Sequence, residues 1–261
     1  MITRTFSFIE RLIYGSEKLF KWIIKSEIKN DLLFFEIGSS DGAEAKLIIN
    51  SKKKTRVVIC EPDKRNINKY DVKIKNNPKV NIINKLISDK SGYKNFYFHK
   101  KLSNLNQSQK PSSDQIKYFE KKKIISTTLK NEFNKYKNFK YTIIKMDIEG
   151  YEYDLLKKNL NFLKNKKNIG LLIELHPTTY KNKEMEKLME KIVSYGFKFK
   201  YVESAGSIIP EIFEQKKYLP FKISTQRGLY KDLNSKFVIE NGFKSKKIKK
   251  SKVIRSVFLK K

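Results

Sequence analysis

The feature of this sequence that most constrains its fold is a series of short apolar runs that alternate with helical patterns. Residues 32–37 are almost entirely apolar and end at a glycine, as expected of a strand that is buried on both faces. Further strands are predicted at 56–60, 80–83, 141–146 and 169–175. Helical patterns are found at 43–50, 63–76, 127–136, 151–163 and 185–192. The alternation predicts an α/β domain with a mostly parallel sheet and helices on both faces.

Three further segments have a weaker pattern. Residues 1–30 carry apolar side chains at helical spacing, which predicts a helical segment packed on the main domain. A basic helix on a membrane surface is the alternative. Residues 93–98 alternate aromatic and polar side chains, as in an edge strand or hairpin arm. Residues 99–123 are poor in apolar side chains and predict a long loop, and 197–202 predict a last strand.

We therefore divide the chain into an N-terminal helical segment (1–30), a main domain (31–203) and a C-terminal extension (204–261). Within the extension, short apolar stretches near Ile208 and Phe237 could add strands or a helix to the edge of the domain. The run at 244–250 is rich in lysine and predicts a basic, solvated tail.

The charge of the chain is strongly positive, with 58 lysines and arginines against 27 aspartates and glutamates and a formal net charge of +31. Such a charge favours a polyanionic partner. However, only six of these bases are arginine, the residue whose planar guanidinium reads bases and binds phosphate bidentately. Lysine is spread along the chain among many Asn and Ile residues, and all three have A/T-rich codons. Genome composition therefore explains the charge, and nucleic acid is an alternative partner that we do not favour.

Several classes of protein are disfavoured by composition. Cys60 is the only cysteine, which excludes a disulfide framework and every multi-thiolate metal site, and we assign no metal ligands. The longest uncharged apolar runs are far shorter than the roughly 20 residues that cross a bilayer. The N-terminus has no apolar signal core followed by small residues, so we expect an uncleaved, cytoplasmic protein.

The residues that follow each strand are the first candidates for function, because ligands of parallel α/β sheets bind beyond the carboxyl ends of the strands. The first strand ends in Glu36-Ile37-Gly38-Ser39-Ser40-Asp41-Gly42. Its two glycines allow a tight turn close to a ligand, and the acid suits a ligand ammonium better than a phosphate. The motif also fits an ordinary turn. Because it is not GxGxxG, a nicotinamide oxidoreductase is disfavoured.

The second strand is followed by Glu61, 25 residues after Glu36. A carboxylate at this position can accept both hydroxyls of an unphosphorylated ribose. A solvated acid at a strand end is the alternative. The neighbouring Cys60 is interpreted as a small buried core residue.

The most specific segment is 143–152, which places three acids after a buried strand: Asp147, Glu149 and Glu152. The two glutamates are also explained by the positive N-terminus of the next helix, which leaves Asp147 without a structural reason. His176 follows the next strand, where a base that titrates near neutrality would be useful. A structural histidine is the alternative, and His99, beside the long loop, has less support.

Taken in order, the segments EIGSSDG, ICEPD, SDKSG, IIKMDIEGYEYDLL and LLIELH resemble the FkbM-type family of S-adenosylmethionine-dependent methyltransferases, over about residues 31–203. The resemblance implies a Rossmann-like class I methyltransferase fold with S-adenosyl-L-methionine as cofactor. It implies methylation of hydroxyl groups, often on sugars or secondary metabolites. The family often has Asn in place of Ser40 and Phe in place of Cys60, which are mild departures.

The resemblance also assigns roles to residues. The expected cofactor-binding residues are Glu36, Gly38, Ser40, Asp41, Gly42, Glu61, Ser88 and Asp89. The first turn would line the methionine part of the cofactor, Glu61 would hold the ribose, and residues 88–89 would lie near the adenine. Asp147 would lie beside the transferring methyl group.

These residues lead to a hypothesis of O-methylation by direct displacement, in which the acceptor is a small-molecule or glycan hydroxyl. Asp147 or His176 would be the base, and Lys145 or Glu149 would orient the acceptor. An RNA or cap ribose 2′-O-methyltransferase is the first alternative, which the net charge favours and the scarcity of arginine does not. A non-catalytic basic adaptor with a Rossmann-like domain is the second. Segments 99–123 and 204–261 lie outside the most specific motifs, and there we expect substrate choice to be determined.

Overall fold

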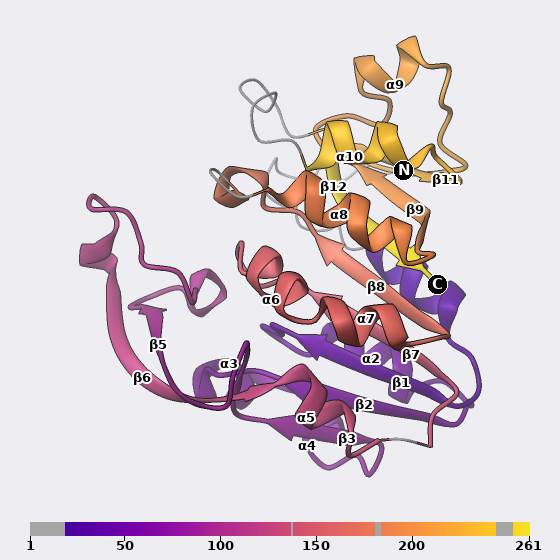
Figure 1. Cartoon of the computed structure of the whole chain (residues 1–261). Helices are drawn as coiled ribbons and strands as arrows, with labels where there is room; N and C mark the ends of the chain where they lie inside the picture. The colour runs from indigo at the N-terminus through magenta and orange to yellow at the C-terminus, as the bar shows by residue number, and fades with distance from the viewer. Residues whose placement is uncertain (1–18, 137, 181–183, 244–252) are drawn as a thin grey trace, which may run out of the picture.

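The structure is a computed structural model and describes residues 19–136, 138–180, 184–243 and 253–261. Its centre is a nine-stranded sheet in the order β10-β11-β9-β12-β8-β7-β1-β2-β3 (Figure 1). Five neighbouring strands run parallel to one another: β3 (Val80–Ile83), β2 (Thr55–Cys60), β1 (Leu32–Ile37), β7 (Tyr141–Met146) and β8 (Ile169–Glu174). The predicted strands and their parallel arrangement are confirmed for this half of the sheet.

The other half of the sheet is antiparallel, so the whole sheet is mixed. It consists of β9 (Lys198–Ser204), β10 (Lys222–Ser224), β11 (Arg227–Lys231) and β12 (Ile254–Lys260). The strand predicted at 197–202 is confirmed as β9, but it is not the last strand, because β10, β11 and β12 follow it. β12 lies between β8 and β9, so one sheet contains strands from both sides of the division at residue 203. A domain boundary at that residue stays a prediction.

Helices cover both faces of this sheet, as predicted (Figure 1). One face is covered by α5 (Leu129–Phe133), α6 (Glu152–Lys158), α7 (Leu160–Asn165), α8 (Met185–Ser194) and α10 (Ser235–Gly242). The opposite face is covered by a helix at residues 19–27, α2 (Ala43–Ile49), α3 (Lys64–Lys69) and α4 (Val72–Lys75). A short helix, α9 (Glu211–Gln215), lies beyond β9.

The helix at 19–27 packs on the main domain through Leu19, Ile23 and Ile24, which are fully buried. The favoured interpretation of the N-terminal segment is therefore confirmed for these residues. Residues 1–18 of that prediction, and the basic run at 244–250, lie outside the described residues.

Two predicted helices are each divided in two. The helix predicted at 63–76 is interrupted where Tyr70 adopts an extended backbone and Asp71 begins α4 by accepting the backbone N–H of Lys73. The helix predicted at 151–163 is interrupted at Asn159, which ends α6 and precedes α7. In both cases the break falls at a polar residue, Asp71 or Asn159, that caps the helix that follows.

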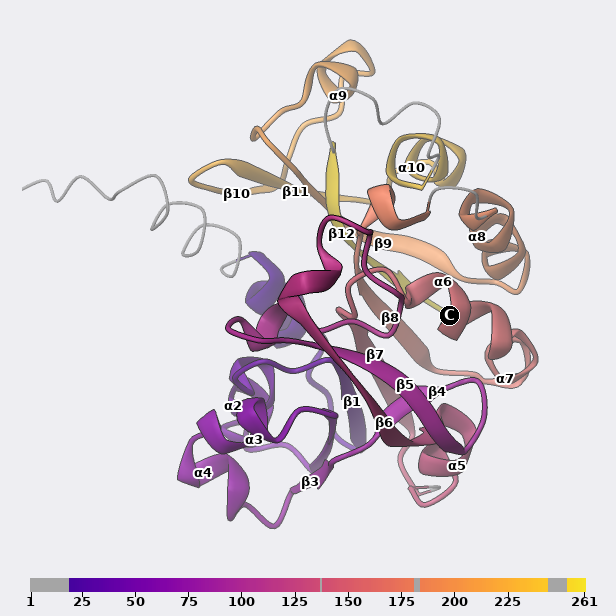
Figure 2. The same cartoon turned by 90° about the vertical axis from the view of Figure 1, so that its left-hand side faces the viewer.

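A second sheet, in the order β4-β6-β5, contains β4 (Leu86–Ser88), β5 (Gly92–His99) and β6 (Phe119–Thr128). β5 and β6 form an antiparallel hairpin, which confirms the predicted hairpin arm (Figure 2). The prediction of a loop over 99–123 is wrong at its end, because 119–123 begin β6. The three lysines at 121–123 pair with β5 and are exposed to solvent. A strand of an exposed hairpin can therefore be as polar as a loop. Among the described residues, no helix has the length and apolarity to span a membrane.

The position of β12 predicts how much the C-terminal strand contributes to stability. Phe258 is fully buried, and its ring lies so close to Gly170 of β8 that a Cβ there would be 2.6 Å away. We expect Phe258→Ala to lower the free energy of unfolding by about 3–5 kcal/mol, measured by urea denaturation. Leu219→Ala, at a side chain that is 76% exposed, is the control, with a change below about 0.5 kcal/mol. Equal effects of the two variants would contradict the central place of β12.

Candidate active site

A cavity of about 570 Å³ lies at the carboxyl ends of the central strands. The turns after β1, β2 and β7 and the loop at 103–108 contribute to its wall. Figure 2 views this edge of the sheet, with the β5–β6 hairpin in front of the strands. The volume is in the range of small-molecule and cofactor sites, and the position is where parallel α/β sheets bind ligands.

The turn after β1 lies in contact with the turn after β7. Gly38 has φ +76°, and a Cβ on it would lie 2.1 Å from the carbonyl oxygen of Asp147. The ammonium of Lys145 donates a hydrogen bond to the Gly38 carbonyl at 2.7 Å. A residue with a side chain at position 38 would push the two turns apart, so glycine is required here.

The remaining residues of the β1 turn begin α2. Gly42 is the N-cap of α2 with φ +73°, and its N–H donates to Ser39 Oγ at 3.1 Å. The Tyr70 hydroxyl donates to the Ser39 carbonyl at 2.8 Å. Ser40 and Asp41 line the cavity. The turn is thus held from two sides while its outer residues face the cavity.

Glu61 lines the cavity at the end of β2 and connects the second turn to the first. Its side chain is buried and accepts the backbone N–H groups of Ser39, at 3.2 Å, and Asp63, at 2.7 Å. Burial raises the pKa of Glu61 to about 7, although the two hydrogen bonds lower it. The structure therefore brings the Glu61 carboxylate against the β1 turn.

Glu36 is fully buried near the end of β1, and neither carboxylate oxygen has a hydrogen-bond partner among the described residues. Burial, together with the charge of Glu44, raises the pKa of Glu36 to about 8. Glu36 itself is not among the residues that line the cavity, although its neighbours Ile37 and Gly38 are. For Glu36, contact with a ligand therefore stays a prediction.

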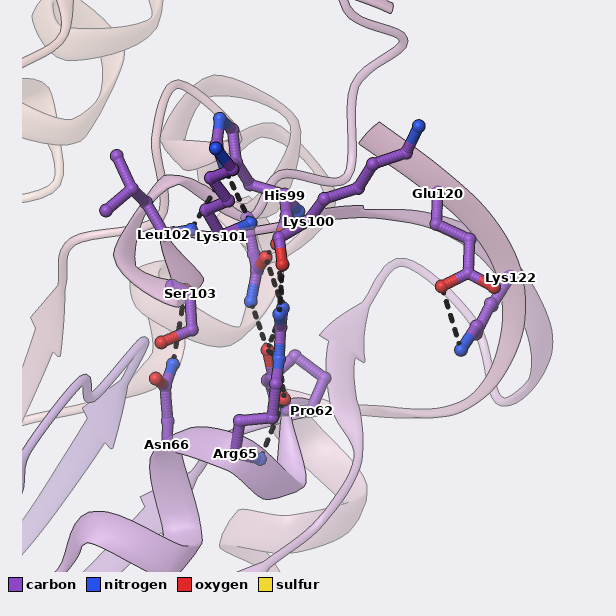
Figure 3. A network of polar contacts seen from close by, with 12 residues as sticks. Pro62, Arg65, Asn66, His99, Lys100, Lys101, Leu102, Ser103, Glu120 and Lys122 are labelled. Atoms are coloured by element: carbon purple, nitrogen blue, oxygen red, sulfur yellow. Dashed lines mark hydrogen bonds and ion pairs between the residues drawn. The ribbon is translucent and has the colours of Figure 1, made fainter. Parts of the chain in front are cut away.

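The loop beyond β5 is held against the β2–α3 turn by a polar network (Figure 3). Arg65 is ion-paired with Asp63 at 2.7 Å and donates to the His99 carbonyl at 3.0 Å. Asn106 donates to the same aspartate at 2.6 Å. His99 Nδ1 accepts the backbone N–H of Leu102 at 2.9 Å. His99 thus organises this loop, whose residues 103–108 contribute to the cavity wall.

Residues 88–89 lie near the cavity without being among the residues that line it. Ser88 Oγ donates to Asp89 at 2.8 Å, and Asp89 is ion-paired with Lys94 at 2.7 Å. The hydrogen bond from Lys94 lowers the pKa of Asp89 to about 2. The wall is formed instead by neighbours that sequence reasoning missed: Leu86, Ile87, Phe96, Gln107 and Tyr151.

The turn after β7 carries Asp147 and Glu149, whose side chains are 33% and 36% exposed and line the cavity. Asp147 Oδ2 lies 3.7 Å from Lys145 Nζ. Burial lowers the pKa of Lys145, but the charges of Asp147 and Glu44 outweigh burial and the net direction is upward. Lys145 is therefore a buried cation that fixes the turns, and a role in orienting an acceptor stays a prediction.

His176, after β8, is placed beside these two acids. Its Nε2 lies 3.8 Å from Asp147 Oδ1 and 3.6 Å from Glu149 Oε2. Its Nδ1 lies 3.0 Å from Glu152 Oε1, and because a carboxylate only accepts, Nδ1 carries the hydrogen. Burial lowers the pKa of His176, but the hydrogen bond with Glu152 and the nearby carboxylates outweigh it and raise the pKa to about 9.

Glu152 holds this histidine in place, a role that the sequence did not indicate. It is the first residue of α6, is fully buried, and accepts the backbone N–H groups of Ile148, at 3.1 Å, and Gly150, at 3.3 Å. The Tyr180 hydroxyl donates to its other oxygen at 3.3 Å. Glu152 and His176 lie 24 residues apart, so only the fold could reveal the pair.

Asp147, Glu149 and His176 also form a group that could hold a metal ion, because one ligand atom from each lies within 4.8 Å of the others. Two carboxylates and an imidazole are ligand types that suit divalent transition metals. The expectation that the site needs no metal stays a prediction.

Comparisons with known proteins agree with this geometry. The family model described as "Methyltransferase FkbM domain" matches residues 35–199, and a search of curated proteins finds no match. Among solved structures, the precorrin-6y C5,15-methyltransferase of Geobacter metallireducens GS-15 is 8% identical, with a TM-score of 0.42, over 92% of this chain and 88% of that one.

Two further structures are similarly distant. An antibiotic-related methyltransferase is 14% identical, with a TM-score of 0.32, over 98% of this chain and 95% of that one. The 23S rRNA methyltransferase ErmE is 11% identical, with a TM-score of 0.34, over 86% of this chain and 74% of that one. At these identities and scores, the solved structures carry no argument about substrate.

The strand order β3-β2-β1-β7-β8-β12-β9, with β12 antiparallel, together with a cavity at the carboxyl ends of the parallel strands, defines a Rossmann-like class I methyltransferase fold. The family match covers well over half of the chain and contains the turns after β1, β2, β7 and β8. The chain belongs to the FkbM methyltransferase family, which confirms the resemblance that its motifs indicate.

The buried, unpartnered carboxyl of Glu36 predicts a pH-dependent stability. The pKa is about 8 in the folded protein against an ordinary value of 4.5, so stability that this group provides at low pH is lost as pH rises between these values. We expect Glu36→Gln to be neutral at pH 4.5 and to stabilise the ligand-free protein by on the order of 3 kcal/mol at pH 8.5. Urea denaturation at both pH values measures this.

Glu190→Gln, at an exposed position of α8, is the matched control and should show no such pH dependence. A Glu36→Gln effect that is the same at both pH values would show that Glu36 is already ionised at the lower pH.

Proposed function

We propose that this protein is an S-adenosylmethionine-dependent O-methyltransferase that acts on a hydroxyl of a sugar, glycan or secondary metabolite. The observation that carries the proposal is the meeting of two turns in one cavity: Glu61, at the end of β2, lies against the glycine turn that follows β1. Membership of a methyltransferase family makes the methyl donor the natural ligand of such turns.

The residues present fit that donor. Glu61 can accept both hydroxyls of a ribose and would repel a phosphate in their place. Gly38 lines the cavity, and the absence of a Cβ lets its backbone lie against Asp147, which brings the turns after β1 and β7 to the same cavity. Neither oxygen of Glu36 has a hydrogen-bond partner in the part of the chain that the structure describes, which suits the ammonium group of the donor, because an ammonium would offset the cost of a buried carboxylate. The hydrophobic residues Ile87 and Phe96 in the wall suit an adenine ring.

When bound, S-adenosylmethionine supplies a methyl group on a sulfonium, which an oxygen nucleophile can attack directly. The chain must hold an acceptor hydroxyl in line and take up its proton. Asp147 lines the cavity and can accept a hydrogen bond from that hydroxyl. Either Asp147 or His176, whose Nε2 lies 3.8 Å from Asp147, would take up this proton. Both routes require a neutral His176, because an imidazolium has no free nitrogen to accept a proton and would stabilise Asp147 as the carboxylate. Glu152 keeps the imidazole oriented toward Asp147.

The charge of the cavity favours a small hydroxylated acceptor over RNA. Seven of the chain's 27 acidic residues line it: Asp41, Glu44, Glu61, Asp147, Glu149, Glu174 and Glu203. Among the described residues only three of the 58 bases do so: Lys145, Arg227 and Arg255. A phosphodiester chain would meet repulsion there, although the protein as a whole is strongly basic. The excess of acids in the cavity also argues against a worn, non-catalytic domain.

The proposal is tested first by cofactor binding, which needs no knowledge of the acceptor. We expect calorimetric titration with S-adenosylhomocysteine to show one site per chain. Glu61→Ala should weaken that binding by about tenfold or more, because the hydroxyls of the ribose lose their acceptor. Glu120→Gln, at an exposed acid of β6 that pairs with Lys122, is the control and should bind as the wild type does. An absence of binding by the wild type would refute the proposal.

Methyl transfer should also depend on pH through His176, whose pKa is raised to about 9. At saturating donor, and with an acceptor found by a screen of hydroxylated compounds, we expect kcat to rise with pH as His176 loses its proton. Glu152→Gln removes a negative charge and keeps an acceptor for Nδ1, so the pKa should fall and the rise should move to lower pH. If the wild type and Glu152→Gln had the same dependence of kcat on pH, His176 would be excluded from proton transfer.

A further inference from the structure

Beyond Asp147 the cavity continues along the antiparallel half of the sheet, where it is lined by two pairs of opposite charge. Glu203, at the end of β9, is buried and pairs with Arg227 of β11 at 3.3 Å. Glu174, at the end of β8, pairs with Arg255 of β12. Ser256 donates to Glu203 at 2.6 Å and lies in register with both glutamates. The pairs are therefore parts of one row across four neighbouring strands, β8, β12, β9 and β11.

The origin of these residues separates them from the cofactor site. Glu203, Arg227 and Arg255 all lie outside residues 35–199, the part that the family model matches. Phe20, from the N-terminal helix, also lines the cavity and lies outside that range. Cofactor residues such as Glu61 lie within it. Apart from Glu174, the charged residues of this row thus come from segments outside the part that the family model matches.

The use of arginine here is a second, independent observation. Only six of 58 bases in the chain are arginine, yet two of the three bases that line the cavity are. Arginine presents a rigid, planar set of donors, which lysine cannot replace where two directed hydrogen bonds are needed. Side-chain exposure is 13% for Arg227 and 35% for Arg255, and both residues line the cavity.

We infer that Glu203, Arg227 and Arg255 are specificity-determining residues that bind the uncharged hydroxyls of the acceptor and exclude phosphorylated acceptors. This inference rests on the proposed function and goes beyond it in naming the residues and the charge of the acceptor. An arginine–glutamate pair offers donors and acceptors side by side, which matches neighbouring hydroxyls that each donate and accept. Because each guanidinium is already paired with a carboxylate, an added phosphate would lie near Glu174 and Glu203, and the described residues that line this row offer no further cation to offset it.

The test uses the full chain with methyl glycosides of glucose, mannose and galactose and with the 6-phosphates of the same sugars. Transfer is followed by release of S-adenosylhomocysteine, and total RNA is included as a further acceptor. We expect unphosphorylated sugars to be methylated at least about tenfold more efficiently than their phosphates. Arg227→Lys should raise KM for the sugar by about tenfold and leave the affinity for S-adenosylhomocysteine unchanged. Lys231→Arg, at an exposed position of the same strand, is the matched control.

Each outcome separates this inference from the proposed function. Preference for sugar phosphates or RNA, or an Arg227→Lys variant with unaltered KM, would overturn the inference while the methyltransferase proposal stands. If the wild type bound S-adenosylhomocysteine but methylated none of the three unphosphorylated glycosides, the inference would also be overturned and the methyltransferase proposal would stand. Failure of the wild type to bind S-adenosylhomocysteine would overturn the proposed function itself.

Discussion

The functional edge of this protein depends on the close contact between the turns after β1 and β7. Gly38 allows its backbone to lie against Asp147, and the buried Lys145 joins the two turns through the Gly38 carbonyl. A buried ammonium is costly unless it is paired, so the hydrogen bond and the nearby Asp147 carboxylate are what make Lys145 tolerable there. This arrangement sets Asp147 next to the turn that we assign to the cofactor. The contact that stabilises the edge is therefore also the one that brings a carboxylate to the proposed reaction site.

The charge of the cavity is opposite to the net charge of the chain. A net charge of +31 describes mainly the surface, where lysines are solvated, whereas the cavity collects acids. Burial acts on individual acids: desolvation raises the pKa of Glu61, which lines the cavity, and of Glu36, which lies near the end of β1 and does not line it. The carboxylates around His176 act in the opposite direction to its burial and raise its pKa. The composition of the chain thus indicates the charge of its surface, whereas the electrostatics of the site depend on local contacts.

The five parallel strands could be predicted because strands buried between two layers of helices leave apolar runs in the sequence. The position of β12 could not, because insertion between β8 and β9 is a pairing between distant segments that no local pattern encodes. β6 was missed in part because its lysines lie on an exposed hairpin. In the site, Glu61 and Asp147 were recognisable as acids at strand ends. The partnership of Glu152 with His176 was not, since it joins residues that only the fold brings together.

The parallel and antiparallel halves of the sheet contribute different parts of the cavity wall. The parallel half brings turns to one edge, and its geometry is fixed by tight glycine contacts that tolerate little change. The antiparallel half contributes single side chains from neighbouring strands, such as Glu203 and Arg227, to one row along the cavity. If the inferred role of this row holds, a substitution there would alter which hydroxyl or charge is accepted and leave the Gly38–Asp147 contact in place. On the proposed function, such a division would let one methyltransferase core serve different acceptors, because the residues inferred to choose the acceptor lie outside the turns proposed to hold the methyl donor.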